Sequence, residues 1–515
     1  MPAADLVLKN ANIITINPSQ PTARLVAIKG DKILLVAGDE ELEQVKGAQT
    51  KVIDCQGKTL VPGFNDAHCH VFSFIRKLLS LDLSPSSVSS IGDIKVAVHH
   101  RAQNVPKGKW LTGTDYNELY LAEKRHPTRW DIDEVAPHHP VVLVHRSLHV
   151  CVLNSLALSL AGITREPSEL PGGLIDRDPN TGEPNGILFE MLGYIRGKVM
   201  PPLSEEELLK GIDLANRHYL SLGITSLQDA TVANDFGRWQ TFHRFKDTGK
   251  LKSRLSMMFG AEALHQFQEQ GLTLGSGDSQ LRLGGIKIML NEAPGQLPPS
   301  QPELNQQALG AHQAGFQLAI HAIEPSSVEA AITALEYVHS QLPQPGRRHR
   351  IEHCAYCPPQ LLKRLRKLQA VVVTQPPFLY YSGERYLATL SASQLQWLCR
   401  IKSFLNGDLI VAGSSDCPVA PDNPLVGIYA AVTRRAESGQ QLPPQECISA
   451  SEALAMYTMG AAYASFEEST KGSITQGKLA DMVILSSDPI KSPPEQIKDI
   501  QVEMTIIGGK VVWEA

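Results

Sequence analysis

Two histidines separated by a single residue are the most informative feature of this sequence. His68 and His70 end the stretch VPGFNDAHCH (61–70). In an extended segment, residues two apart point to the same face, so both imidazoles can reach one metal ion. The pair alone is weak evidence, because surface histidines also occur at this spacing by chance. It becomes informative through the positions of the other candidate ligands.

Four further polar residues fall inside or at the end of apolar, strand-like segments. Lys287 lies in GIKIM, His321 ends LAIH, His353 ends RIEH and Asp416 closes IVAGSSD. Parallel barrel strands would bring these side chains to the carboxyl-terminal rim, where barrel enzymes carry their sites. Each histidine alone is more commonly a buried residue with a hydrogen-bond partner. Histidines and an aspartate converging on one rim, however, form a donor set suited to zinc.

The segments that carry these residues alternate with helical stretches. From about residue 203, apolar β-rich runs recur roughly every 30 residues, the size of a βα unit. Helices are expected over 326–337 and 359–368. Eight strands of this kind predict an α/β fold built on a TIM (β/α)8 barrel. The predicted strands are 59–64, 223–229, 254–259, 285–290, 317–322, 350–353, 370–375 and 409–416.

Both ends of the chain are strand-like, which predicts a second, small domain. Short apolar runs separated by Asn, Gly and Asp occupy each end, too few to bury a core alone. We therefore expect 1–60 and 465–515 to form a composite β-sandwich and 61–464 to form the barrel domain. About 160 residues separate the first two barrel strands, too many for an ordinary connection. An inserted subdomain or lid is expected at about 80–200.

Several segments, taken in chain order, resemble a known family. They are VPGFNDAHCH, GGIKIM, LAIHAIE, RIEHC and GSSDCPV, and the likeness continues in GGLIDRDPNTGEPNGILFE (172–190) and GSITQGKLADMVIL (472–485). Together they resemble the metal-dependent amidohydrolase superfamily, and within it the branch that contains N-substituted formamide deformylases. The resemblance covers nearly the whole chain. It is specific for superfamily and branch and unspecific for substrate.

The resemblance implies that six residues form a metal site. Four histidines, one lysine and one aspartate match the family's ligand positions, and the aspartate is also implied to be the catalytic proton acceptor. The implied ligands are His68, His70, Lys287, His321, His353 and Asp416.

Lys287 corresponds to a lysine that, in related binuclear enzymes, is carboxylated by carbon dioxide and bridges two metals. Only the modified form is chemically suitable, because an ammonium group has no lone pair whereas a carbamate offers two anionic oxygens. The alternative is a buried lysine paired with Glu292 or Asp416 beside a single metal ion. The segment that follows, LNEAPGQ (290–296), departs from the Asp-Gly-Ser of many relatives. For this reason no substrate is carried over from them.

Four further residues are candidates for substrate binding. His149, in LHVCVLNS (148–155), matches a histidine that the branch usually carries, and a surface histidine of the inserted subdomain is the alternative. Glu190 is a candidate for orienting work, because a buried carboxylate needs a partner. Arg385 and Tyr386 end the aromatic segment FLYYSGERY (378–386), which suits a substrate-covering loop, although such aromatics more commonly pack.

Composition excludes several classes of protein. The 48 Lys and Arg against 53 Asp and Glu give a net charge of −5 and no basic face for nucleic acid or a membrane. No apolar run approaches the ~20 residues of a membrane span, and no signal-peptide pattern is visible. Eight scattered cysteines are typical of reduced thiols, so a cytoplasmic protein is expected. A homodimer is expected only as the commonest closed assembly.

The combined expectation is an enzyme acting on a small molecule. It is predicted to be a metal-dependent hydrolase that cleaves a non-peptide C–N bond, in an amide, formamide, lactam or cyclic imide, by metal-activated hydroxide. Zinc is the expected metal, with two ions per chain, and manganese, iron and cobalt are alternatives. Two alternative functions stay open: a mononuclear metal-dependent deaminase, and a non-catalytic scaffold with the same fold.

Overall fold

The computed structural model describes residues 2–166, 173–290, 292 and 299–515. Contacts divide the chain into two compact units. The first unit comprises the chain up to Val71 and most of the chain from Ala215 onward, and the second comprises Phe72–Leu214. The predicted domain bounds stay predictions.

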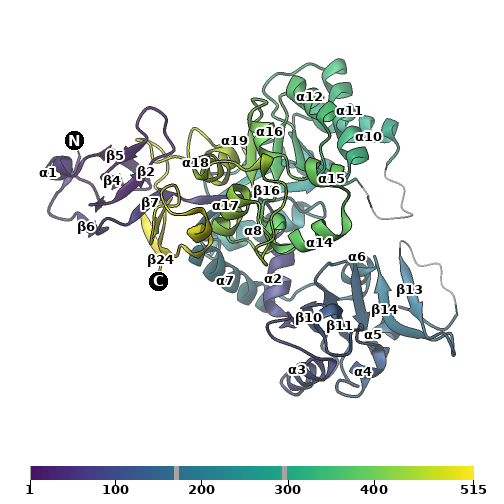
Figure 1. The fold of residues 1–515 in the computed structure, drawn as a ribbon. Helices are drawn as coiled ribbons and strands as arrows, with labels where there is room; N and C mark the ends of the chain where they lie inside the picture. Colours follow the sequence, from purple (N-terminus) through teal and green to yellow (C-terminus); the bar gives the residue numbers. More distant parts are fainter. Residues whose placement is uncertain (1, 167–172, 291, 293–298) are drawn as a thin grey trace. The chain divides into compact units, whose positions relative to one another are not determined.

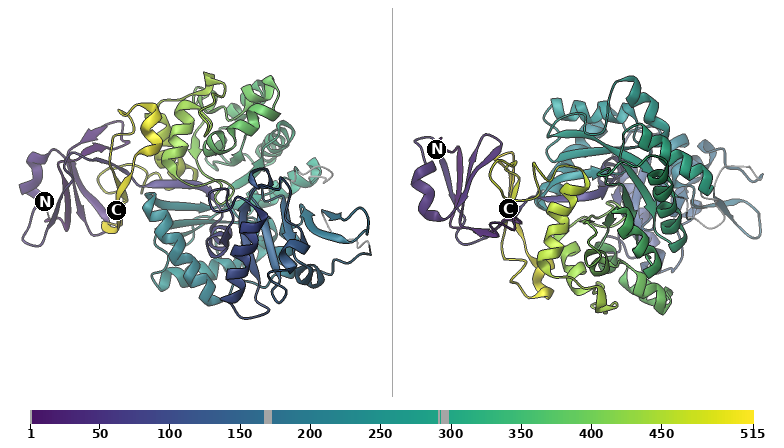
Figure 2. Two further views of the ribbon diagram at one scale, coloured as in Figure 1. Left: turned by 60° about the horizontal axis from the view of Figure 1, so that its bottom comes forward. Right: turned by 90° about the horizontal axis from the view of Figure 1, so that it is seen from above.

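Eight parallel strands form one sheet in the first unit, and their order in the sheet follows the chain. Several are buried along their whole length, as in Val371–Thr374, because both faces of a barrel strand are covered. Helices between the strands lie on the outside of this sheet (Figure 2). The predicted α/β barrel is confirmed. Its strands are β8 (Phe64–Cys69), β15 (Ile224–Asp229), β16 (Arg254–Gly260), β17 (Leu281–Ile288), β18 (Leu318–Ala322), β19 (Arg350–His353), β20 (Val371–Thr374) and β21 (Val411–Gly413).

The first and last strands of this sheet meet at a seam without a regular ladder. The amide of Asp416 donates to the carbonyl of His68, and the amide of His70 donates to the carbonyl of Cys417, both at 2.8 Å. Cys69 and Cys417 also form an isolated parallel bridge. These contacts close the barrel, and they place the residues that end β8 beside those that follow β21.

Asp66 spans the same seam with its side chain. Its Oδ1 accepts hydrogen bonds from the amides of His68 and Ser415, both at 3.1 Å, and its Oδ2 accepts one from the Ser415 hydroxyl. Burial raises the pKa of Asp66 to about 7, against the opposing effect of these hydrogen bonds. One buried carboxyl group thus satisfies three donors, one from β8 and two from the segment that follows β21.

The two ends of the chain form a β-sandwich in the same unit, as predicted (Figure 1). A four-stranded sheet has the order β5-β4-β1-β6, and a six-stranded sheet has the order β24-β23-β22-β7-β2-β3. Leu8 and Val26 of the first sheet share one apolar core with Leu60, Met482 and Ile506 of the second. The strands are β1 (Leu6–Lys9), β2 (Asn12–Ile14), β3 (Thr22–Ala23), β4 (Leu25–Lys29), β5 (Lys32–Ala37), β6 (Lys51–Asp54), β7 (Thr59–Pro62), β22 (Met482–Leu485), β23 (Val502–Ile507) and β24 (Lys510–Glu514).

One strand predicted for the barrel belongs to the β-sandwich instead. The prediction of 59–64 as the first barrel strand is wrong, because Thr59–Pro62 is β7 and pairs with β2 and β22. The barrel strand begins at Phe64. The chain passes from one sheet to the other at Gly63, where a Cβ atom would lie only 2.2 Å from Oγ1 of Thr225. The apolar run TLVPGF (59–64) crosses this boundary without a polar break.

Helix boundaries in the first unit follow local capping signals. The α10 helix begins with a capping box between Ser300 and Glu303, and α12 ends with Gln369 in the left-handed conformation. The predicted helix 359–368 is confirmed as α12, and 326–337 lies within α11. The main helices are α8 (Phe236–Asp247), α9 (Leu264–Glu269), α10 (Gln301–Gln313), α11 (Pro325–Gln341), α12 (Pro359–Leu368), α13 (Pro377–Tyr381), α14 (Gly383–Thr389), α15 (Ala392–Trp397), α16 (Ile401–Leu405), α17 (Pro424–Thr433), α18 (Ala450–Ala455) and α19 (Ala461–Ala464).

The second unit has its own six-stranded sheet, in the order β13-β14-β12-β11-β10-β9. Alternate residues of one strand enter different cores: Val141 and Leu143 pack on one face, and Val142 and Val144 on the other. The unit follows β8 in the chain, so the predicted insertion after the first barrel strand is confirmed. Its elements are α2 (Val71–Leu79), β9 (Leu81–Asp82), α3 (Ile91–Gln103), β10 (Leu111–Tyr116), α4 (Arg129–Asp133), β11 (Val141–His145), β12 (Val150–Leu153), α5 (Ser155–Leu160), β13 (Leu174–Arg177), β14 (Pro184–Phe189) and α6 (Leu192–Tyr194), and α7 (Glu205–Ser221) leads back to the first unit.

None of the helices in the described part of the chain is both long and apolar enough to cross a membrane.

Replacing Asp66 by alanine is expected to lower the free energy of unfolding by about 3 kcal/mol or more, because buried donors left unpaired cost about 1–3 kcal/mol each. Urea titration followed by circular dichroism measures the change. Asp54→Ala is the control, since the exposed side chain of Asp54 contacts Asn10, the Gln56 amide and Lys9 at the surface. Equal unfolding midpoints for the Asp66→Ala and Asp54→Ala variants would contradict the role of the Asp66 contacts in closing the barrel.

Candidate metal centre

Four histidine side chains of the first unit meet at the carboxyl-terminal ends of barrel strands. The ring centroids of His68 and His70 lie 5.3 Å apart, and those of His68 and His353 lie 4.9 Å apart. The centroids of His321 and His353 are separated by 4.5 Å. These residues come from β8, β18 and β19 and the position after β8, and parallel strands place such ends at one rim.

Asp416 and Lys287 lie against the same histidines. Oδ1 of Asp416 is 3.0 Å from Nε2 of His70 and 3.5 Å from Nε2 of His68. Nζ of Lys287, a residue of β17 that is only 1 % exposed, lies 3.4 Å from Nε2 of His68. The structure therefore brings all six predicted ligands together. We call His68, His70, Lys287, His321, His353 and Asp416 the six-residue cluster.

The donor atoms of this cluster are spaced for a cation. Among the described residues, ligand atoms of His68, His70 and Asp416 all lie within 4.8 Å of one another. Zinc binds imidazole nitrogen and carboxylate oxygen at about 2.0–2.2 Å, so small side-chain adjustments bring three such atoms to one ion. The residue types and their spacing fit a divalent metal.

Burial keeps three of the histidines neutral. The pKa values of His68, His321 and His353 all lie below the ordinary range, because removal from water penalises the imidazolium form. The charge of Lys287 lowers all three pKa values further, while Asp416 opposes the shift at His68 and His353 and Glu352 opposes it at His321. Metal binding requires the neutral imidazole, so these side chains need lose no proton to act as ligands.

The pKa values of Lys287 and Asp416 are shifted in directions that also suit metal binding. Burial lowers the pKa of Lys287 to about 8, although Glu352 and Asp416 oppose this effect. Burial alone would raise the pKa of Asp416, but the hydrogen bond from His70 and the nearby imidazoles outweigh it and hold that pKa below the usual range. The cluster thus contains an ionised carboxylate and a lysine whose neutral amine is accessible near neutral pH.

A hydrogen bond behind His353 sets its tautomer. Nδ1 of His353 lies 2.8 Å from Oε1 of Gln375, and the Gln375 amide nitrogen donates to Oγ of Ser414 at 2.9 Å. The Gln375 oxygen can only accept, so Nδ1 of His353 carries the proton and Nε2 keeps its lone pair. Nδ1 of His70 lies 2.8 Å from Oγ1 of Thr231, a hydroxyl that can donate or accept, so this contact does not by itself set a tautomer.

Two members of the cluster adopt the left-handed backbone conformation. The φ angle is +70° at His353 and +63° at Asp416, and it is +47° at Cys354. Such values are uncommon outside glycine and persist where surrounding contacts hold the chain. In a regular strand Glu352 and His353 would face opposite sides. Here both contact His68, because the strand ends at this turn of the backbone.

The four predicted substrate-binding residues fall in two places. In the second unit, Nδ1 of the exposed His149 lies 2.9 Å from Oε1 of Glu190. In the first unit, Arg385 and Tyr386 lie on α14, with the guanidinium over the tyrosine ring at 5.1 Å from its centroid. Their substrate contacts stay predictions.

The loop after Lys287 is described only in part. Of the chain-specific segment 290–296, residues 291 and 293–296 lie outside the described residues, as does residue 172. Glu292, an alternative partner considered for Lys287, accepts a hydrogen bond from the amide of Ile323 at 2.8 Å.

Sequence reasoning missed three residues that contact the candidate ligands from behind, namely Glu352, Gln375 and Thr231. A signal existed for Gln375, the polar residue that ends the apolar run AVVVTQ (370–375). The signal for Glu352 pointed the wrong way, since strand alternation places it on the face opposite to His353.

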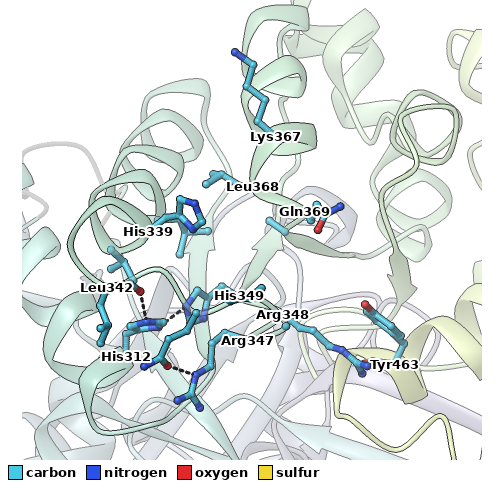
Figure 3. A pocket seen from close by; sticks show the side chains of 16 residues that line it. His312, His339, Leu342, Arg347, Arg348, His349, Lys367, Leu368, Gln369 and Tyr463 are labelled. Carbon is cyan, nitrogen blue, oxygen red and sulfur yellow. Dashed lines mark hydrogen bonds between the residues drawn. The ribbon is translucent and has the colours of Figure 1, made fainter.

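A separate cavity of about 170 Å³ lies at the amino-terminal ends of the barrel strands, among residues that precede β19 and β20 (Figure 3). Its His349 accepts a hydrogen bond from the Leu318 amide at Nδ1, so Nε2 carries the proton and donates to Nδ1 of His312 at 2.9 Å. Nε2 of His312 donates in turn to the carbonyl of Leu342 at 3.0 Å. Both rings are neutral and all four of their nitrogens are paired, so these histidines serve packing.

The whole chain matches known proteins. The amidohydrolase family matches residues 51–513. The N-substituted formamide deformylase of Arthrobacter pascens is 28% identical, over 99% of this chain and 98% of that protein. Protein LONG AFTER FAR-RED 3 of Arabidopsis thaliana is 30% identical, over 99% of this chain and 92% of that protein. The crystal structure of an uncharacterized metal-dependent hydrolase from Pyrococcus furiosus is 25% identical with a TM-score of 0.76, covering 94% of this chain and 100% of that one.

These findings confirm the predicted class, a metal-dependent barrel hydrolase that acts on small molecules. Within that class, the chain belongs to the amidohydrolase family.

His349 predicts a pH dependence of stability. Burial, with help from His312 and Arg347, lowers its pKa to about 3, whereas a histidine in an unfolded chain titrates near 6.5. Between these values the unfolded state binds the extra proton, so the contribution of neutral His349 is complete above about pH 6.5 and is lost as the pH falls toward 3. His349→Gln is expected to flatten the fall in unfolding free energy over this range, measured by urea titration at successive pH values. A profile identical to that of the exposed control variant His339→Gln would refute the assignment.

Proposed function

We propose that this enzyme hydrolyses a C–N bond in a small amide, formamide, lactam or cyclic imide, with the six-residue cluster as its metal site. The observation that carries the proposal is the convergence of four imidazoles, one carboxylate and one buried lysine at the rim of the barrel. The similarity to the N-substituted formamide deformylase, over nearly the full length of both chains, supports the C–N bond as the target.

The cluster would hold zinc, and its imidazole and carboxylate donors also accept manganese, iron or cobalt. His68, His70, His321, His353 and Asp416 are the proposed ligands. A bound ion of this kind supplies a Lewis acid for the carbonyl oxygen of the substrate and lowers the pKa of water.

Lys287 is proposed to be carboxylated and to allow a second metal ion. An ammonium group offers no lone pair and repels a cation. With the pKa of Lys287 lowered to about 8, the neutral amine is accessible near neutral pH. That amine adds to carbon dioxide, forming an N–C bond and releasing one proton, and the carbamate gains two anionic oxygens. These oxygens suit a bridge between two ions.

Asp416 is the proposed catalytic proton acceptor. It is the carboxylate of the cluster, with Oδ1 3.0 Å from Nε2 of His70, and its pKa is held low. It would take the proton from the attacking water and return it to the departing nitrogen, as a general base and then a general acid.

Asp416→Asn tests the function directly. The amide oxygen is a far weaker base, so turnover is expected to fall by at least roughly 100-fold. Amine release is followed on a panel of N-alkylformamides, lactams and cyclic imides, and metal content is measured in every sample. Asp422→Asn is the matched control, because Asp422 is buried nearby in the chain and bonds His218. Near-wild-type turnover by metal-loaded Asp416→Asn would refute the assignment. Ammonia release from aminated heterocycles, with no turnover of the panel, would favour the deaminase alternative.

Metal removal tests the number of ions and the state of Lys287. Chelation is expected to abolish turnover and zinc to restore it, with two equivalents bound per chain. Mass spectrometry at neutral pH should show the mass of one carbon dioxide added at Lys287. Lys287→Met should remove both that mass and one equivalent, whereas Lys471→Met should remove neither, since the buried Lys471 pairs with Glu467. One equivalent without added mass would establish a one-metal site.

A further inference from the structure

A fully buried carboxylate lies directly behind the six-residue cluster. Oε2 of Glu352 is 2.5 Å from Nδ1 of His68, on the side of the ring away from Lys287 and Asp416. The exposed fraction of Glu352 is 0%, and that of His68 is 1%. Glu352 belongs to no ligand position of the proposed metal site.

Arg350 holds both oxygens of this carboxylate. Its Nε donates to Oε1 of Glu352 at 2.7 Å, and its Nη2 donates to Oε2 at 2.9 Å. Residues two apart on β19 share a face, so the pairing needs no distortion of the strand. The two parallel hydrogen bonds fix the plane of the carboxylate as well as its position.

The guanidinium is itself held from two other strands. Nη1 of Arg350 donates to Oε1 of Gln228 on β15 at 2.6 Å, and Nη2 donates to the carbonyl of Ala67 on β8 at 2.8 Å. The amide nitrogen of Gln228 donates to the carbonyl of Ala461 at 2.7 Å. Rotation of Glu352 away from His68 would break this chain of hydrogen bonds, so its direction is set by three strands and α19.

A gain in folding stability does not explain why Arg350 and Glu352 are paired in the barrel interior. Burying an arginine and a glutamate costs desolvation energy that their attraction rarely exceeds, and apolar side chains of similar volume often stabilise a protein as well or better. Apolar side chains at these positions could not reproduce the hydrogen bond between Glu352 and His68.

We propose that Glu352, held by Arg350, is the positioning residue that sets the tautomer and ring orientation of His68 for metal binding. The inference rests on the proposed metal-dependent function. A carboxylate without a proton only accepts hydrogen bonds, so Nδ1 of His68 donates to it and the lone pair of Nε2 is directed into the cluster.

The partner of His68 also differs in kind from those of its neighbours. On Nδ1, His70 and His353 have neutral partners, Thr231 and Gln375, whereas His68 has a carboxylate. A carboxylate on Nδ1 increases the electron-donating strength of Nε2, which strengthens its bond to a metal. Among these three histidines, His68 is thus the one whose bond to a metal would be strengthened by a carboxylate outside the cluster.

Glu352→Gln is the test. The glutamine has the same size, but it can turn its amide nitrogen to Nδ1 of His68 and so favour the tautomer with the proton on Nε2, which cannot bind metal. The zinc dissociation constant of the full-length protein is expected to rise roughly 10- to 100-fold. It is measured on metal-free protein by competition with a chromophoric chelator, a readout independent of turnover.

The matched control is Asp481→Asn. Asp481 accepts two hydrogen bonds from Arg254, at 2.6 and 2.9 Å, and both residues are buried in the same unit without contacting the cluster. Loss of this charge disturbs a comparable ion pair, and zinc affinity should stay at the wild-type value. Equal losses in the Glu352→Gln and Asp481→Asn variants would overturn the inference, as would wild-type affinity in folded Glu352→Gln.

A second variant covers the case in which Glu352→Gln does not fold, since it leaves Arg350 without its counter-charge. The double variant Arg350→Met/Glu352→Gln removes both charges, which proteins tolerate better than the loss of one. It should also bind zinc weakly, and wild-type affinity would overturn the inference. If the wild-type protein binds no zinc, the proposed function fails and the inference fails with it. If the wild type binds zinc and Glu352→Gln binds it equally well, the inference alone fails.

Discussion

The barrel can close only where its first and last strands meet, and the arrangement of the candidate metal ligands depends on that closure. The amides of His70 and Asp416 make the closing hydrogen bonds, and their side chains belong to the cluster. These two residues are 346 positions apart in the chain, so bringing them together requires a large loop to close. The same residues therefore close the barrel and assemble the candidate site. A barrel that fails to close at this seam has no site.

The interior behind the site contains more charge than an ordinary barrel core. Arg350, Glu352 and Lys287 are all fully or almost fully buried, in a position where barrels usually carry branched apolar side chains. Each has an electrostatic partner, and the surrounding strands supply hydrogen bonds that a looser packing could not. Burying these charges costs desolvation energy. Burial of apolar side chains elsewhere in the barrel, as in β16 and β20, offsets that cost. The chemistry of the rim is thus supported by a polar layer beneath it.

The parts of this fold that follow from the local pattern of apolar and polar residues could be predicted. The boundary between two sheets and the left-handed backbone conformation at a strand end could not. The spacing of apolar runs and the strand-end positions of His321, His353 and Asp416 were sufficient to predict the barrel and to bring the candidate ligands to one rim. The boundary between β7 of the β-sandwich and β8 of the barrel was not predicted, because the segment TLVPGF is apolar on both sides of Gly63. Glu352 escaped it because the left-handed conformation of His353 breaks strand alternation, and nothing in the residue types signals that conformation.

The long insertion leaves and re-enters the barrel between strands that are hydrogen-bonded neighbours. β8 and β15 pair in parallel, with Cys69 opposite Asp229, although the entire second unit lies between them in the chain. Because β8 and β15 are parallel, the chain leaves at the carboxyl end of β8 and must return to the amino end of β15, and α7 makes that return after the inserted segment. The barrel is in this respect modular: its strand order and ligand positions set no limit on the length of what is inserted there. A segment of different size or sequence can occupy this position while the chemistry of the rim stays the same.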